Sequence, residues 1–441
     1  APEVVLVGWE LVNQLWKSGI PKQALHFVPT LDNEVGRKLV SHQDVDKVVL
    51  TGAYETAVKF KSWRPDLDLV AETSGKNSII VTNSSDIDLA VSDIVKSAFG
   101  HAGQKCSAGS LAIVEKEIYN NPLFFKQLVD ATNSLSVGNP TNLGNSVGPI
   151  IKDPDEKLLR ALTELEEGEE WLVKPEVLSN SNCWTPGIKI NVQPNSWTHM
   201  NEWFGPVLGI MKVPNLKKAI EWQNATDYGL TAGLHSLSTK ECNYWLKNVE
   251  AGNLYINRPI TGAVVKRQPF GGWKKSSFGS TVKAGSSYYP SIFKRYNQVK
   301  DYDILVNELE ELWSIKSKKI KNDNLQSEHN YSVLYPHKKV LIVHDENPNP
   351  EFKKYLDSIK KIFGLTVDEI EFSKLEDNDS IDKYSLVRWL SREPAPEWIY
   401  KYNFSLDTNH IVQNSRIEIF SWVREQSISI TNHRYGNIGF S

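Results

Sequence analysis

Residues 70–77 read VAETSGKN, a strand-like apolar run that ends in Glu72 and then breaks at Ser74 and Gly75. An acid at the carboxyl end of a parallel strand points into the crevice where ligands of open α/β sheets bind. Taken alone, such a glutamate is more often a solvated residue or a helix cap. Glu72 therefore becomes a candidate only together with a second reactive group in the same chain.

The sequence upstream of Glu72 alternates strand-like runs with helical patterns. The strand-like runs lie at 24–29 (ALHFVP), 47–52 (KVVLTG) and 66–72 (DLDLVAE), and the helical patterns at 5–19, 33–42 and 55–63. Such alternation is typical of βαβ units around a parallel sheet. We therefore predict an α/β fold.

Downstream of Glu72, a helical pattern over 86–99 leads into residues 100–110, GHAGQKCSAGS, where Cys106 lies among small residues. A thiolate attacks electron-poor carbonyl carbons, and small neighbours leave room for one. The alternative for a lone cysteine is a small buried hydrophobe. A cysteine-protease type of pairing with His101 has no local signature to support it.

The composition indicates a globular protein of two or three domains. The chain has 441 residues, 40% of them hydrophobic and 23% charged, a net charge of -3 and 3 cysteines, which we expect to be free thiols. Charges of both signs are interspersed, so we expect a small-molecule partner and no nucleic acid. The sequence shows no transmembrane run and no signal-peptide pattern, which favours the cytoplasm, and we expect no metal site.

Several motifs together resemble the aldehyde dehydrogenase superfamily. Glu72 in ETSGKN and Cys106 in GQKC resemble its paired glutamate and cysteine signatures. Four more segments resemble family motifs in the family's order, namely LTGAYETA (50–57), NEWFGPVLG (201–209), NATDYGLTAGLHS (224–236) and AGNLYINRP (251–259). Each is weak alone, but their order makes the resemblance strong.

Within the superfamily, residues 260–279, ITGAVVKRQPFGGWKKSSFG, and the serine directly after Cys106 are similar to enzymes that oxidise L-glutamate γ-semialdehyde, the open form of 1-pyrroline-5-carboxylate. The similarity is greatest to the proline utilisation A type. It implies the second step of proline catabolism, with NAD as the oxidant. It also implies that Cys106 adds to the aldehyde as the nucleophile and that Glu72 is the general base that activates water against the resulting thioester.

The resemblance also assigns the cofactor-binding and substrate-binding residues. Glu202 matches the residue that binds the nicotinamide ribose, and Phe204 the aromatic ring beside it. Thr51, Gly52 and Ala53 lie at a strand-to-helix turn that faces phosphate, although the family usually has serine at the position of Ala53, which puts one hydroxyl contact in doubt. For the substrate, the family positions correspond to Ser107, Gly262, Ala263 and Phe270, the first three for its α-carboxylate and Phe270 for its aliphatic stem.

The fold implied is an aldehyde dehydrogenase fold, a partial Rossmann-like NAD-binding domain plus an α/β catalytic domain, with an extra C-terminal α/β unit. We assign 1–75 to the NAD-binding domain, 76–258 to the catalytic domain, 259–297 to a substrate-anchoring loop and return segment, 298–330 to a linker or helical segment, and 331–441 to the C-terminal unit and tail.

Family members carry, before the point where this chain begins, an asparagine of the oxyanion hole and a lysine that contacts the cofactor. We therefore expect this chain alone to be inactive. The resemblance further implies a homo-oligomer and a proline dehydrogenase domain, upstream or as a partner, with FAD only in that domain. Two alternatives stay open: the same fold acting on another aldehyde, and a non-catalytic scaffold or oligomerisation module.

Overall fold

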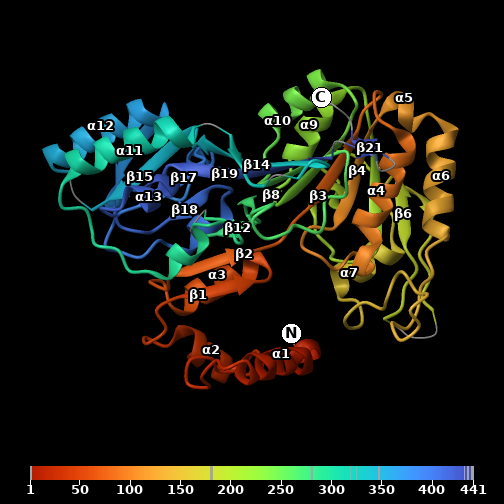
Figure 1. The fold of residues 1–441 in the computed structure, drawn as a ribbon, viewed down its shortest axis with the longest axis horizontal. Coiled ribbons are helices and arrows are strands. Elements are labelled where there is room, and N and C mark those ends of the chain that lie inside the picture. The colour runs from red at the N-terminus through yellow and green to blue at the C-terminus, as the bar shows by residue number, and fades with distance from the viewer. Residues whose placement is uncertain are drawn as a thin grey trace.

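The fold is described from a computed structural model over residues 2–178, 182–279, 282–317, 319–323, 325–345, 348–431, 433–434 and 437–438. Figure 1 shows three regions: an N-terminal region with α1 and a small sheet, a catalytic region built on a large sheet, and a C-terminal unit on the opposite side of the molecule. Strands β14 and β19 run between the last two (Figure 1). None of the helices in the described part of the chain is long and apolar enough to span a membrane.

The N-terminal region follows the predicted alternation, with one exception. It contains α1 (Val5–Lys17), α2 (Glu34–Ser41), β1 (Val48–Thr51), α3 (Tyr54–Trp63) and β2 (Leu69–Glu72). Strands β1 and β2 pair in parallel, and β12 (Ser277–Phe278) adds antiparallel to β2. The strand predicted at 24–29 is wrong, because no described strand lies beside that segment to satisfy its backbone groups.

The catalytic region is built on a ten-stranded sheet with the order β13-β14-β19-β10-β9-β3-β4-β7-β6-β5. Its strands are β3 (Asn77–Val81), β4 (Gly109–Glu115), β5 (Glu170–Val173), β6 (Gly187–Ile190), β7 (Val207–Val213), β9 (Thr231–His235), β10 (Asn253–Ile256), β13 (Ile320–Lys321), β14 (Glu328–Pro336) and β19 (Val423–Thr431). Every residue of β3, β9 and β10 is buried, as expected of parallel strands covered on both faces.

Helices cover both faces of this sheet. They are α4 (Ile87–Phe99), α5 (Lys116–Tyr119), α6 (Pro122–Asn133), α7 (Glu156–Thr163), α8 (Trp197–Met200), α9 (Leu216–Asn224) and α10 (Thr239–Asn248). The helix predicted over 86–99 is confirmed, since the Asp86 side chain accepts the N–H of Leu89 as N-cap and α4 runs to Phe99. Its buried face packs on β4, so the turn after α4 is held rigidly.

The C-terminal unit differs from the predicted segments. A separate four-stranded parallel sheet, in the order β16-β15-β17-β18, is formed by β15 (Lys339–His344), β16 (Thr366–Glu371), β17 (Leu386–Trp389) and β18 (Ser405–Asp407). Its helices are α11 (Tyr302–Lys316), α12 (Pro350–Phe363) and α13 (Ser415–Glu418). Two short pairs complete the description, β8 (Tyr228–Gly229) with β11 (Trp273–Lys274), and β20 (His433–Arg434) with β21 (Asn437–Ile438).

The segment 298–330, predicted as a linker or helical segment, contains the helix α11, whose Leu305 and Leu309 are fully buried in the core of the C-terminal unit. One predicted boundary needs correction. Residues 331–441 are not one unit, because β14 and β19 pair with each other and β19 pairs with β10, so both strands extend the catalytic sheet. A side chain on either strand can therefore reach both regions.

Candidate active site

Glu72 is the last residue of β2 and is positioned from two sides. The backbone N–H of Gly272 donates to its Oε2 at 3.3 Å, and β12 pairs with it through Ser277. Burial raises the pKa of Glu72 to about 8, while the nearby charge of Lys283 and the Gly272 hydrogen bond act in the opposite direction. A carboxyl group in this environment exchanges protons near neutral pH, as a general base must.

Cys106 lies in a turn that only an unusual backbone can make. After α4, a 3-10 turn (Gly100–Gly103) contains left-handed residues at His101, Ala102 and Gly103, with φ of 57°, 52° and 67°. A Cβ on Gly103 would lie 2.2 Å from the carbonyl oxygen of Gly205, so only glycine fits there. The turn that leads to Cys106 is therefore packed directly against the backbone of Phe204 and Gly205.

The thiol of Cys106 is half-buried, and its environment favours the protonated form. Burial raises the pKa of Cys106, and the nearby charge of Glu72 raises it further, while the backbone N–H of Ser107 lowers it. The thiolate is the reactive species. The site therefore needs a base to take the proton, and Glu72 is close enough to feel the charge of the thiolate.

Glu202 connects the base strand to the segment after α8. Its carboxylate accepts the backbone N–H of Gly75 at 2.9 Å, just after the point where β2 ends. Burial raises the pKa of Glu202, and the hydrogen bonds from Gly75 and Ser74 oppose this. The Nζ of Lys76 lies 3.2 Å from the centre of the Trp203 ring; a charge on Lys76 lowers the pKa of Glu202, while burial lowers the pKa of Lys76 itself well below its usual range.

Phe204 is 43% exposed and has a left-handed backbone, with φ of 53°. Its carbonyl accepts the side-chain amide of Gln104 at 3.2 Å, which ties it to the nucleophile turn. A large aromatic ring left this exposed, two residues from Glu202, fits a flat ring or ribose of a cofactor. The Glu202 carboxylate offers acceptor oxygens that suit a diol.

Thr51, Gly52 and Ala53 lie at the exposed end of β1, where α3 begins. The backbone N–H of Gly52 donates to the carbonyl of Glu72 at 3.2 Å, so this donor already fixes the end of β2. Ala53 is the N-cap of α3 and makes no side-chain cap hydrogen bond. The first turn of α3 thus keeps backbone donors without a side-chain partner, a fit for a phosphate group.

Hydrogen bonds to β14 and β19 fix the predicted substrate loop. The side chain of Gln268 accepts the N–H of Val264 at 2.9 Å and donates to Asn330 of β14 at 2.6 Å. Ser427 of β19 donates to the carbonyl of Pro269. Gly262, with φ of 85°, and Ala263 lie at the open side of this loop.

Phe270 and Ser107, the other two predicted substrate residues, are both held by hydrogen bonds to neighbouring segments. Phe270 is half-buried and exchanges two backbone hydrogen bonds with Ala284, of 2.8 and 3.0 Å. Ser107 is buried next to the nucleophile, and its carbonyl faces the Thr231 hydroxyl at 3.4 Å. The roles of all these residues toward substrate and cofactor remain predictions.

Sequence reasoning missed three residues that shape the site. Lys283 is fully buried and lies near Glu72. Gln268 hydrogen-bonds to the substrate loop, and Asn77 hydrogen-bonds to the loop that contains Cys106. Lys283 and Gln268 carry no signal in their local sequence, because their partners lie far away along the chain. Asn77 lies in the ETSGKN motif, but the motif does not indicate its partners: it donates hydrogen bonds to the carbonyls of Cys106 and Ala108, at 2.7 and 3.0 Å.

The fold and this cysteine–glutamate site define a class. The profile of the aldehyde dehydrogenase family matches residues 1–300, and the chain therefore belongs to that family. Similar curated proteins are the 1-pyrroline-5-carboxylate dehydrogenases of Bacillus licheniformis, 33% identical over 306 residues and 67% of this chain, and of Staphylococcus epidermidis, 36% identical over 302 residues and 66% of this chain. The chain spans 58% and 57% of the length of these two relatives.

Solved structures agree with this assignment. Proline utilization A from Corynebacterium freiburgense is 40% identical, with a TM-score of 0.89, and the match covers 99% of this chain and 47% of that one. A Thermus 1-pyrroline-5-carboxylate dehydrogenase with bound NAD is 31% identical, with a TM-score of 0.61, and the match covers 66% of this chain and 58% of that one. The predicted aldehyde dehydrogenase fold is confirmed, including an α/β unit beyond the catalytic sheet.

Proposed function

We propose that the polypeptide carrying this chain oxidises L-glutamate γ-semialdehyde, formed from 1-pyrroline-5-carboxylate, to L-glutamate with NAD+. The observation that carries the proposal is the pairing of a protonated, half-buried Cys106 thiol with a carboxyl group, Glu72, whose pKa lies near 8. Relatives that share a third or more of the sequence are 1-pyrroline-5-carboxylate dehydrogenases.

The first step uses the raised pKa values of both groups. Glu72 takes the proton from the Cys106 thiol, and the thiolate adds to the aldehyde carbon. The backbone N–H of Cys106 is one donor for the oxyanion that forms. A tetrahedral thiohemiacetal on Cys106 results, from which the carbon can release a hydride.

The second step hydrolyses the thioester left on Cys106. Glu72 first releases to solvent the proton that it took from the thiol. It then accepts a proton from water while the resulting hydroxide attacks the acyl carbon, the bond to the Cys106 sulfur breaks so that L-glutamate leaves, and Glu72 returns its proton to the thiolate. When bound, NAD+ accepts the hydride released in the first step. Glu202 would hold its ribose hydroxyls, Phe204 would pack beside it, and the first turn of α3 would face its phosphates.

Substrate recognition follows from the loop above β14 and β19. The α-carboxylate of the semialdehyde would accept hydrogen bonds from the backbone of Gly262 and Ala263 and from the Ser107 hydroxyl. Phe270 would pack on its aliphatic stem. This placement favours an aldehyde with a carboxylate at its far end over a simple aliphatic aldehyde.

The test is NADH formation by the full polypeptide with 1-pyrroline-5-carboxylate, compared with acetaldehyde and hexanal. We expect a kcat/KM for 1-pyrroline-5-carboxylate at least about a hundredfold higher, since losing a charge-assisted anchor costs several kcal/mol. Equal use of hexanal would favour the alternative of another aldehyde. No activity with any aldehyde, together with an inert Cys106, would favour the scaffold.

Further expectations from the resemblance remain proposals. We expect this chain by itself to be inactive, which the same assay on the isolated chain tests. We also propose a link to a flavin-dependent proline dehydrogenase domain, because the similar proline utilization A chain is about twice as long as this one. A homo-oligomer stays a prediction, which light scattering of the full polypeptide tests.

A further inference from the structure

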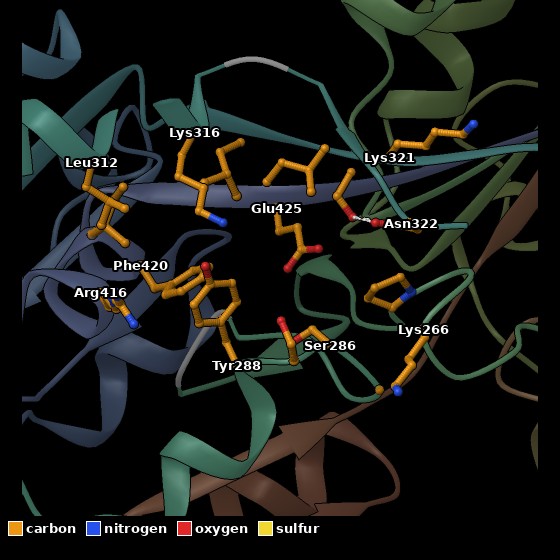
Figure 2. Close-up of a pocket in the computed structure, with 17 residues that line it drawn as sticks. Lys266, Ser286, Tyr288, Leu312, Lys316, Lys321, Asn322, Arg416, Phe420 and Glu425 are labelled. Atoms are coloured by element: carbon orange, nitrogen blue, oxygen red, sulfur yellow. Dashed lines mark hydrogen bonds between the residues drawn. The ribbon is translucent and has the colours of Figure 1, made fainter. Parts of the chain in front are cut away.

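A second cavity, of about 260 Å³, lies between the catalytic region and the C-terminal unit. Its walls come from α11, from β14 and β19, from the loop at 285–288 and from the segment 416–420 (Figure 2). Neither Cys106 nor Glu72 lines it. Its volume is below the range of about 300–1,000 Å³ that holds drug-sized ligands, so its ligand must be small.

Much of the wall is apolar. The side chains of Leu312, Leu334, Ile419 and Phe420 line it, together with the ring of Tyr288. Leu334, Ile419 and Phe420 also belong to the buried core of the C-terminal unit, so this side of the cavity is preformed. An apolar wall of this kind binds an aliphatic or aromatic group of a ligand.

A buried carboxylate faces the cavity. Glu425 of β19 is only 6% exposed, and its side chain points into the centre of the space (Figure 2). Burial raises the pKa of Glu425, while the charges of Lys283 and Lys316 and the Ser332 hydroxyl lower it. The buried Ser286 hydroxyl oxygen, also on the wall, has no hydrogen-bond partner in the described chain. Both groups suit a ligand that donates hydrogen bonds.

A cation faces the same space from the other side. Lys316, in the last turn of α11, directs its ammonium toward the centre, 5.0 Å from the centre of the Tyr288 ring (Figure 2). No ion pair joins Lys316 to Glu425 among the described side chains, although the charge of Lys316 lowers the pKa of Glu425. Lys266 and Arg416 are exposed at the margin, and Lys321 points away (Figure 2).

We propose that this cavity binds a free α-amino acid with an apolar side chain. Its ammonium group would donate to Glu425 and Ser286, its carboxylate would accept from Lys316, and its side chain would lie against Leu312, Leu334 and Phe420. A zwitterion pairs with the Glu425 carboxylate and the Lys316 ammonium at once, whereas a ligand with one charge can pair with only one of these two groups. The cavity shares Lys266 and Pro269 with the predicted substrate loop, but neither the reactive pair Cys106 and Glu72 nor Phe270 lines it.

The probe is L-leucine, titrated calorimetrically into the full polypeptide, beside two analogues that each lack one charged group, 4-methylpentanoate and 3-methylbutylamine. We expect saturable binding of L-leucine and at least about tenfold weaker binding of both analogues. Lys316→Met and Glu425→Gln should each weaken L-leucine binding by a similar factor. Lys353→Met and Glu376→Gln, exposed and away from the cavity, are matched controls that should leave it unchanged.

Three results would overturn the proposal: no saturable binding of L-leucine, binding that both cavity variants leave intact, or an analogue that binds as tightly as L-leucine. If 4-methylpentanoate binds as tightly as L-leucine, the cavity is an anion site. If 3-methylbutylamine does, it is a cation site. Thermal unfolding without ligand checks that each variant is folded. If Glu425→Gln fails this check, Lys316→Met decides, because Lys316 is partly exposed and lies at the end of its helix.

Discussion

Glu72 and Lys283 lie on either side of Gly271. A Cβ on Gly271 would lie 2.9 Å from the Oε1 of Glu72 and 3.1 Å from the Cγ of Lys283, so only glycine lets the two side chains approach this closely. The Lys283 ammonium donates to the carbonyl of Gly252 and, at 3.2 Å, to Asn253. A cationic group is thereby placed next to the candidate base, and burial lowers the pKa of this Lys283 ammonium to about 8.

The first prediction removes that charge by Lys283→Met. Lys283 lowers the pKa of Glu72 from what burial alone would give, so its loss raises this pKa above about 8. Glu72 acts as a base only when deprotonated, and the acidic limb of the kcat profile should therefore move to higher pH. Lys275→Met is the control, since Lys275 pairs with Asp227, and its profile should not move. An unshifted limb in Lys283→Met would contradict the assigned electrostatics.

The second prediction concerns Asn77. Asn77→Asp keeps the acceptor for the Thr231 N–H but loses the donor to Cys106 and Ala108, and it sets a carboxylate against two carbonyl oxygens. Unsatisfied buried groups cost about 1–3 kcal/mol each. We expect a loss of about 2 kcal/mol in the free energy of unfolding and, because the nucleophile shifts, a kcat lower by about a hundredfold. Denaturant titration and steady-state kinetics measure both, with the exposed Asn142→Asp as the matched control.

How far the sequence predicts this molecule depends on how local each feature is. Glu72 and Cys106 stand in short motifs, and α4 has its cap and apolar stripe within its own residues. By contrast, β14 and β19 are separated along the chain by the whole C-terminal sheet, so neither strand's own sequence indicates that the two pair. The same applies to Gln268, whose partner Asn330 lies on β14. Residues 24–29 show the opposite error: their sequence predicts a strand, but no described strand lies beside them to pair with.

The third prediction separates the two roles of Glu72. In Glu72→Gln the charge that raises the pKa of Cys106 is gone, so this pKa should fall and iodoacetamide should label Cys106 at lower pH than in the wild type. Aldehyde oxidation should nevertheless fall by about a hundredfold or more, because no base remains to activate water. Mass mapping of labelled Cys106 against pH, beside NADH formation, gives both readouts. Slower labelling of the variant across the whole pH range would show that Glu72 does not act on the thiol as described.

The last prediction concerns the hydrogen bonds by which Gln268 links the substrate loop to β14. Gln268→Leu keeps the side-chain volume but removes the acceptor for the Val264 N–H and the donor to Asn330, so the loop loses its link to β14. If the loop binds the substrate carboxylate equally in the ground state and the transition state, KM for 1-pyrroline-5-carboxylate should rise about tenfold while kcat changes little. The half-buried Gln127 of α6, which donates to Asp88 far from the substrate loop in the sequence, provides the control Gln127→Leu, for which KM should stay unchanged. An aldehyde without a carboxylate should show no such rise in either variant, because it makes no use of the loop. A fall in kcat at constant KM would instead place Gln268 in the support of the reacting centre.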